Sequence, residues 1–277
     1  MNARWQSLKF SVAPPFLLAR RCSFAIASRP KSMLAQLPLQ FEFNTQSSFS
    51  NYYPGRNAEV VSLLQQAIQQ GNEQFIFIWG ETGLGKSHLL HACSQLAHEL
   101  TQSSFIYSFK PGLLPNTQLL EDLEEIDWVC LDNIDCIAGD SAWEMAFFNF
   151  FNRHRDQDRH IILSAHCPPQ YLTVQLPDLK TRLNWGLTLK LQELTDDDCI
   201  AALKFKAAIL GFEIKPQVGQ FLLTHFARDL PSLWRLLDEL DQASLAAKRK
   251  LTLPFLRQLL KNAPARDAKT KKTPTTR

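Results

Sequence analysis

The chain has 277 residues, which is enough for one large domain and a small one, or for two domains of moderate size. Its net charge is only +3, and no apolar run approaches the about 18 residues of a membrane-spanning helix, so the sequence excludes such a helix. The six cysteines form no Cys-x-x-Cys pair, and we expect them to be reduced core residues of a soluble, cytoplasmic protein.

The two ends of the chain differ from its middle. Residues 1–32 contain no acidic residue and several Arg and Ser residues, a composition that fits a transit peptide. We favour a disordered extension or a start-site artefact, with translation starting at Met33. Residues 262–277 consist mainly of Lys, Thr, Pro and Arg and are expected to form a disordered basic tail. Because basic residues gather at both ends, the near-neutral middle gives no sign of a nucleic-acid-binding surface.

Five apolar runs of strand length are separated by helical patterns. Alternating strands and helices predict an α/β domain with a parallel sheet that is covered by helices on both faces. The helix expected at residues 141–154 carries a wide apolar surface, Met145 included, which we assign to the core. The strands are expected at residues 75–79, 104–109, 128–131, 161–164 and 187–191.

The pattern after the last expected strand contains helices alone. Thr195 precedes three aspartates, which is an N-cap followed by acids in the first turn, and Gly211 ends that helix. Three more helices are expected after Pro216, near Pro231 and after Thr252. The sequence therefore predicts a small all-α helical domain appended to the α/β domain.

A complete phosphate-binding P-loop, Gly-Glu-Thr-Gly-Leu-Gly-Lys-Ser, directly follows the first expected strand. Its glycines let the backbone turn tightly and point N–H groups at phosphate oxygens, and the N-terminus of the following helix attracts anions. Lys86 is expected to reach the β- and γ-phosphates of ADP or ATP, and Ser87 the Mg²⁺ ion. The predicted nucleotide-binding residues are Gly80, Glu81, Thr82, Gly83, Leu84, Gly85, Lys86, Ser87 and His88.

The third expected strand is closed by Asp132, an acid after an apolar run, as in a Walker B motif. Asp132 is expected to hold Mg²⁺ through water, together with Ser87. ATPases with these motifs usually carry a second acid that polarises the attacking water, and Asn133 stands at that place. Since an amide cannot act as a base, we expect intrinsic ATP hydrolysis to be weak or absent.

Three segments resemble the AAA+ module of the bacterial replication initiator family, DnaA. They are the P-loop with its following His-Leu-Leu-His, the stretch Arg-x-x-Trp-Gly-Leu at residues 182–187, and residues 251–256. The similarity covers about residues 49–261. In this family the second stretch carries an arginine finger, so the resemblance makes Arg182 a catalytic residue that acts in trans on a neighbour's γ-phosphate. Without the resemblance, Arg182 reads as an ordinary surface arginine.

A short apolar peptide just after Met33 is similar to the peptides with which many proteins dock on the replicative sliding clamp. Read alone, its apolar residues also fit an edge strand. We find no segment that fits the initiator's helix-turn-helix domain or its amino-terminal interaction domain. The combination resembles the Hda family of regulatory inactivators, and residues 132–134, 137–140 and 143–146 resemble that family too. The predicted clamp-binding residues are Gln36, Leu37, Pro38, Leu39, Gln40 and Phe41.

Two positions depart from the initiator pattern. Pro231 takes the place of the sensor 2 arginine, so either Arg228 or Arg235 replaces that arginine or the nucleotide lacks the contact. His166 stands where an acidic sensor 1 residue is expected, and it fits either a hydrogen bond to phosphate or a loop position.

The resemblance also implies an adenine pocket at residues 49–55. Either Tyr52 or Tyr53 would stack on the base, and the sequence leaves this choice open.

We therefore expect five segments along the chain. Residues 1–32 are followed by a clamp-binding segment and linker at residues 33–48. Residues 49–194 form the AAA+ nucleotide-binding domain, residues 195–261 the helical lid domain, and residues 262–277 the tail.

The resemblance implies a negative regulator of DNA replication initiation. Such a protein binds ADP or ATP, docks on the sliding clamp (the β subunit) loaded on DNA, and stimulates ATP hydrolysis by DnaA, which prevents re-initiation. One alternative is a helicase-loader-type ATPase, against which Asn133 and Pro231 argue. Another is a DnaA paralogue that acts on DNA, for which the part after Lys261 is too short and too polar. A homo-oligomer stays open, and no membrane partner is expected.

Overall fold

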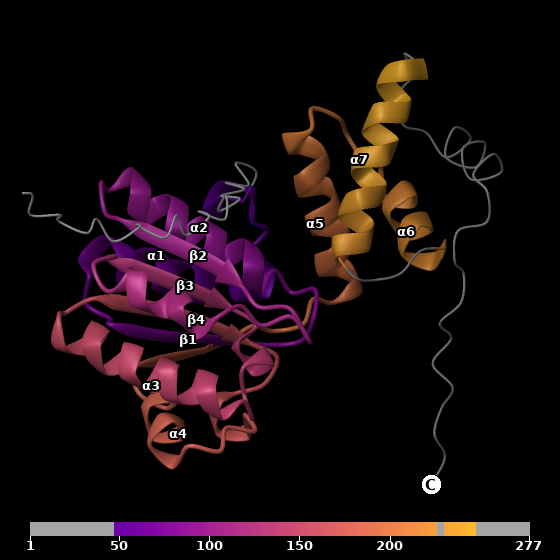
Figure 1. Cartoon of the computed structure of the whole chain (residues 1–277). Helices are drawn as coiled ribbons and strands as arrows, with labels where there is room; N and C mark the ends of the chain where they lie inside the picture. The colour runs from indigo at the N-terminus through magenta and orange to yellow at the C-terminus, as the bar shows by residue number, and fades with distance from the viewer. Residues whose placement is uncertain (1–46, 226–229, 248–277) are drawn as a thin grey trace, which may run out of the picture. The chain divides into compact units, whose positions relative to one another are not determined.

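The computed structural model describes residues 47–225 and 230–247 (Figure 1). The predicted clamp peptide at residues 36–41, the helix expected after Thr252 and both expected tails lie outside the described residues. Within the described part, no helix has the length and apolarity that crossing a membrane requires.

Five strands form one parallel sheet in the order β2-β3-β4-β1-β5, which confirms the predicted fold class. β1 lies between β4 and β5, with Phe75 opposite Ile161 and Ile76 opposite Leu187. The strands are β1 (Phe75–Trp79), β2 (Ser104–Ser108), β3 (Trp128–Asp132), β4 (His160–Ala165) and β5 (Leu187–Lys190).

Helices cover both faces of the sheet. Figure 1 shows α1 and α2 on one face and α3 and α4 on the other. The helices of this part are α1 (Ala58–Gln70), α2 (Lys86–Glu99), α3 (Ser141–Asp156) and α4 (Pro177–Leu183). Short 3-10 helices are η1 (Phe49–Asn51), η2 (Gly55–Asn57), η3 (Thr117–Leu123), η4 (Ile134–Cys136) and η5 (Pro169–Tyr171).

The core consists of two apolar layers because successive strand residues point to opposite faces. Phe75 and Phe77 of β1 belong to the layer beneath α3, whereas Ile76 and Ile78 belong to the layer beneath α1 and α2. These four side chains are buried, with exposed fractions of 5% or less.

The aromatic surface of α3 packs in the core as predicted, with one exception. Trp143, Phe147, Phe150 and Phe151 are buried, but half of Met145 is exposed. At about 100° per residue, Met145 lies about 200° from Trp143 around the helix and therefore faces away from the sheet. The assignment of Met145 to the core was wrong.

A second, smaller core holds the helices after the sheet, α5 (Asp196–Ile209), α6 (Pro216–His225) and α7 (Leu230–Ala247). Thr195 caps α5 as predicted. Its hydroxyl accepts a hydrogen bond from the backbone N–H of Asp198, and the Asp198 carboxylate accepts one from the Thr195 N–H. The buried residues of this core include Leu203, Val218, Leu222, Leu233 and Leu237.

Two side chains before α1 reach the chain after β5, one at the segment that leads to α5 and one at the first turn of α5. The buried amide of Asn57 donates to the Gln192 carbonyl at 3.1 Å and accepts from the Gln192 N–H at 2.7 Å. Arg56 forms an ion pair with Asp198 at 3.4 Å, and its side chain is 54% exposed. The Asn57 contact thus fixes the backbone directly after the sheet.

Candidate functional site

The P-loop lies where β1 ends and α2 begins, as the sequence predicts. Gly85 has a left-handed φ of +88°, and a Cβ atom there would lie 2.7 Å from Cε2 of Tyr52, so both backbone and space favour glycine. Lys86 is buried, and its ammonium donates to the carbonyls of Gly80 at 2.7 Å and Glu81 at 2.9 Å. Burial lowers the pKa of Lys86, and the nearby carboxylate of Asp132 opposes this effect.

Asp132 is buried at the end of β3 and is held by three hydroxyl groups. Ser87 of α2 donates to Oδ2 at 2.6 Å, and Ser108 at the end of β2 donates to the same oxygen at 3.0 Å. Ser164 of β4 donates to Oδ1. Because the carboxyl ends of parallel strands meet at one edge, the sheet brings Asp132 directly to the P-loop serine.

Asn133 follows Asp132 in the left-handed region, with a φ of 58°, a conformation that asparagine tolerates better than most residues. Its backbone N–H donates to the Ser164 hydroxyl at 3.1 Å. Its side-chain amide donates to the Ser108 hydroxyl at 3.2 Å and to the Phe109 carbonyl at 3.4 Å. The position thus holds a hydrogen-bond donor rather than a base.

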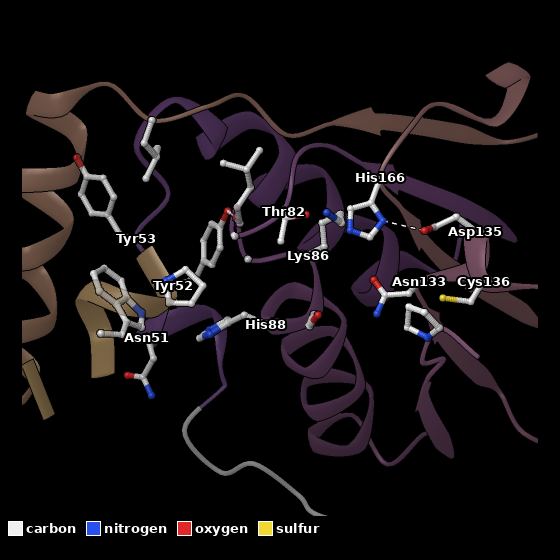
Figure 2. A pocket seen from close by; sticks show the side chains of 18 residues that line it. Asn51, Tyr52, Tyr53, Thr82, Lys86, His88, Asn133, Asp135, Cys136 and His166 are labelled. Atoms are coloured by element: carbon white, nitrogen blue, oxygen red, sulfur yellow. Dashed lines mark hydrogen bonds and ion pairs between the residues drawn. The ribbon is translucent and has the colours of Figure 1, made fainter. Parts of the chain in front are cut away.

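A pocket of about 530 Å³ opens around the P-loop (Figure 2). Figure 2 shows Tyr52, Tyr53 and His88 on one side of Lys86, and Asn133 and the side chains around it on the other. Seven of the nine predicted nucleotide-binding residues line this pocket, namely Thr82, Gly83, Leu84, Gly85, Lys86, Ser87 and His88. Gly80 and Glu81 line a neighbouring pocket of about 410 Å³.

The two tyrosines have different surroundings, although both line the pocket. Tyr52 is buried behind the P-loop, its hydroxyl donates to the Leu84 carbonyl at 3.1 Å, and burial raises its pKa to about 12. Tyr53 lies with its ring 5.9 Å from that of Phe205 on α5. Tyr52 is buried against Leu84 and Gly85 of the P-loop, whereas Tyr53 is half-buried.

His166 and Pro231, the two residues that differ from the initiator pattern, also line the pocket. His166 follows β4, and its Nδ1 lies 2.8 Å from Oδ2 of Asp135, a hydrogen-bond contact marked in Figure 2. Pro231 and Trp234 come from the first turns of α7. Arg235 does not line the pocket, because its guanidinium donates to the Pro231 carbonyl and to Ser232 on its own helix. Arg228 lies outside the described residues.

Arg182 lies in the last turn of α4, far from the P-loop of its own chain. Its guanidinium carbon is 4.2 Å from the ring centre of Trp185, which lines a different pocket together with Phe75. Phe75 begins β1, whereas the P-loop follows its last residue, and a strand of five residues separates its ends by about 13 Å. Arg182 therefore lies toward the amino-terminal ends of the parallel strands, and the P-loop lies at their carboxyl ends.

Known protein families match both the sheet domain and the helices after it. Residues 43–190 match the bacterial DnaA ATPase domain, which is more than half of the chain. The chain belongs to the bacterial DnaA ATPase-domain family. Residues 196–260 match the lid domain of Hda. The resemblance to DnaA and Hda that the motifs indicate is thus confirmed.

Solved structures of the DnaA family and of a further AAA+ protein share the fold. AMPPCP-bound DnaA from Aquifex aeolicus is 21% identical, with a TM-score of 0.62, over 71% of this chain and 65% of that one. Domain III of the Thermotoga maritima initiator DnaA is 20% identical, with a TM-score of 0.65, over 78% and 96%. The Thermotoga maritima RuvB branch migration motor is 15% identical, with a TM-score of 0.58, over 80% and 73%. The chain thus spans about two thirds of the Aquifex protein.

Sequence reasoning missed several residues of the pocket. Pro111 follows β2, Cys136 lies in η4, and Leu194 precedes α5, and no motif marks any of them. A signal was available for Pro111 and Cys136, because both closely follow the ends of expected parallel strands, where ligands bind in open α/β sheets. For Leu194 and Trp234 the sequence offered none, since they reach the pocket through the packing of the helices after the sheet.

Proposed function

We propose that the chain is a nucleotide-holding negative regulator of replication initiation. It docks on the DNA-loaded sliding clamp and stimulates ATP hydrolysis by a DnaA-type initiator. The observation that carries this proposal is the position of Arg182, which lies toward the ends of the strands opposite to those that carry its own P-loop. An arginine there serves a phosphate of a neighbouring molecule rather than one bound in its own pocket.

The residues around the pocket fit a nucleoside di- or triphosphate with Mg²⁺. Lys86 and the P-loop N–H groups would hold the phosphate oxygens, and the Ser87 hydroxyl beside the Asp132 carboxylate would hold Mg²⁺. A bound nucleotide supplies negative phosphate charge that the P-loop and the start of α2 attract. With Asn133 as a donor in place of a base, the chain holds its nucleotide with little hydrolysis of its own.

Replacing Lys86 by alanine is expected to weaken nucleotide binding by about 10- to 100-fold, because hydrogen bonds to charged groups contribute about 1.5 to 3 kcal/mol. Titration of the purified chain with fluorescent ADP in the presence of Mg²⁺ measures the dissociation constant. Lys110→Ala is the matched control, since Lys110 is exposed and does not line the pocket. An unchanged constant in the Lys86 variant would contradict the assignment of this pocket.

The proposed mechanism joins two contacts. The segment at residues 33–48 tethers the chain to the clamp through Gln36 to Phe41, which raises the local concentration of the weak contact with the initiator. In that contact Arg182 enters the neighbour's nucleotide site. Its guanidinium then donates hydrogen bonds to the phosphate oxygens on which charge develops.

The test measures initiator ATP hydrolysis with the chain, the clamp and DNA, and with each component left out in turn. We expect stimulation only with all of them, and we expect Leu37→Ala/Leu39→Ala to abolish both the stimulation and the retention of the chain on clamp beads. Leu113→Ala is the control, because Leu113 is 69% exposed and lies outside the tether. Undiminished stimulation by the double variant would refute tethering through residues 36–41. Rapid ATP turnover by the chain alone would instead favour a helicase-loader-type ATPase.

A further inference from the structure

The side chain of Arg182 lies on aromatic rings and not against a carboxylate. Its guanidinium carbon is 4.2 Å from the ring centre of Trp185 and 5.9 Å from that of Phe148 on α3. No ion pair of Arg182 occurs within the described residues, whereas the α3 residues Arg153 and Arg155 pair with Glu124 and Asp156. Within the described residues, no carboxylate compensates the charge of Arg182, and two aromatic rings restrain its side chain.

An aromatic support suits an arginine that must donate elsewhere. A ring face attracts the flat face of a guanidinium and leaves the in-plane N–H groups available. A carboxylate partner would occupy those same N–H groups and neutralise the charge. The stack on Trp185 therefore orients Arg182 without using the donors that a phosphate would need.

Trp185 itself is fixed by its surroundings, although 42% of it is exposed. Its backbone N–H donates to the Arg182 carbonyl at 2.9 Å. The buried ring of Phe151 meets its indole at 6.3 Å in an edge-on contact, and the Arg155 guanidinium lies 5.8 Å from the indole centre. Phe148, Phe151 and Arg155 are spaced three and four residues apart and so share one face of α3.

The helix that carries Arg182 is also anchored. Glu144 of α3 is buried, and its carboxylate accepts hydrogen bonds from the backbone N–H groups of Gln175 and Leu176, directly before α4. These two contacts fix the start of α4 against α3. The anchoring therefore fixes the position of Phe148 on α3 relative to Arg182 on α4.

We propose that Trp185, assisted by Phe148, is a positioning residue that holds the Arg182 guanidinium extended for a phosphate of a neighbouring initiator molecule. This inference rests on the proposed function, in which Arg182 acts in trans. The stack limits the rotamers of a long side chain before the two molecules meet, so less conformational freedom is lost when the transition state forms.

The test compares Arg182→Ala, Trp185→Ala, Trp185→Phe and the double variant Arg182→Ala/Trp185→Ala in the clamp-dependent initiator hydrolysis assay. Each variant is titrated to saturation, which separates the plateau rate from the concentration that gives half of it. We expect Trp185→Ala to lower the plateau about 3- to 30-fold, the range that a cation–π contact supports. Trp185→Phe, which keeps a ring face, should restore most of the plateau, and the double variant should equal Arg182→Ala.

Tyr171→Ala is the matched control, since Tyr171 is an aromatic residue that is 72% exposed, whereas the rings beside the Arg182 guanidinium are those of Trp185 and Phe148. Thermal unfolding checks that each variant is folded. If Trp185→Ala does not fold, Phe148→Leu takes its place, with a smaller expected loss of the plateau.

The outcomes separate the two proposals. A wild-type plateau for Trp185→Ala beside an inactive Arg182→Ala overturns the positioning role and leaves the proposed function standing. An unchanged plateau with a raised half-maximal concentration also overturns it, because Trp185 would then serve docking alone. Undiminished stimulation by Arg182→Ala removes the finger assignment and the positioning role with it.

Discussion

Replacing Arg182 by alanine is expected to slow ATP hydrolysis by the clamp-stimulated initiator by about 10³-fold or more, which is the effect that arginine fingers supplied in trans have. The loss is large because the guanidinium donates hydrogen bonds to phosphate oxygens on which charge develops in the transition state. The neighbouring arginines of α3 form exposed ion pairs, Arg155 with Asp156 at 2.7 Å and Arg153 with Glu124 at 2.8 Å. A single-turnover measurement on ATP-loaded initiator, with clamp and DNA present, gives the rate directly.

Two further variants sharpen this prediction. Arg182→Lys keeps the charge but loses the planar fork of donors, so we expect a rate between those of wild type and alanine. Arg153→Ala is the control, because Arg153 is an arginine of α3 whose guanidinium lies beside Glu124. Equal losses in Arg153→Ala and Arg182→Ala would mean that overall charge, and not one finger, controls the rate.

Gly186→Ala is expected to lower the free energy of unfolding by about 3 kcal/mol. Gly186 has a left-handed φ of +74°, and a Cβ atom there would lie 2.2 Å from the carbonyl oxygen of Phe75. A contact this short with backbone forces β5 away from β1, which adds an overpacking cost of about 1 to 3 kcal/mol to about 1 kcal/mol of backbone strain. Urea unfolding followed by circular dichroism measures the difference.

Gly112→Ala separates these two contributions. Gly112 has a similar φ of +72°, but nothing lies within 4 Å of the added Cβ atom. Only the backbone strain of about 1 kcal/mol should appear there. If both variants lost the same stability, the close approach of residue 186 to β1 would have no energetic weight.

The sequence was sufficient to predict the strands and several helix starts, but not the order of the strands within the sheet. The apolar runs predict all five strands to within one residue at either end, because buried parallel strands read as uninterrupted apolar stretches. The helix starts at Lys86 and Asp196 were equally readable, since a P-loop and Thr195 precede them. The order β2-β3-β4-β1-β5 depends on contacts between distant residues that no local pattern contains.

The residues of the candidate site also fall into two groups, those that motifs predict and those that only the fold brings together. Motifs have fixed spacing, so Lys86, Ser87 and Asp132 could be assigned from the amino-acid sequence alone, and Ser87 and Asp132 do meet at 2.6 Å. The hydroxyl groups of Ser108 and Ser164 around Asp132 could not be assigned, because they reach it only when the strand ends come together. The stack of Arg182 on Trp185 was hidden for another reason. Trp185 lies after the end of α4, so helical spacing does not place its ring on Arg182, and the contacts with Phe148 and Phe151 of α3 form only in the folded chain.

The paired hydrogen bonds between Asn57 and Gln192 determine where the protein can bend. They clamp the backbone just after β5, as a neighbouring strand would. The ion pair between Arg56 and Asp198 is exposed and restrains the start of α5 only weakly. A change of angle between the sheet and the helices after it would therefore be taken up by the backbone dihedrals of Glu193 and Leu194. Leu194 also lines the P-loop pocket, so such a change of angle would alter the wall of that pocket.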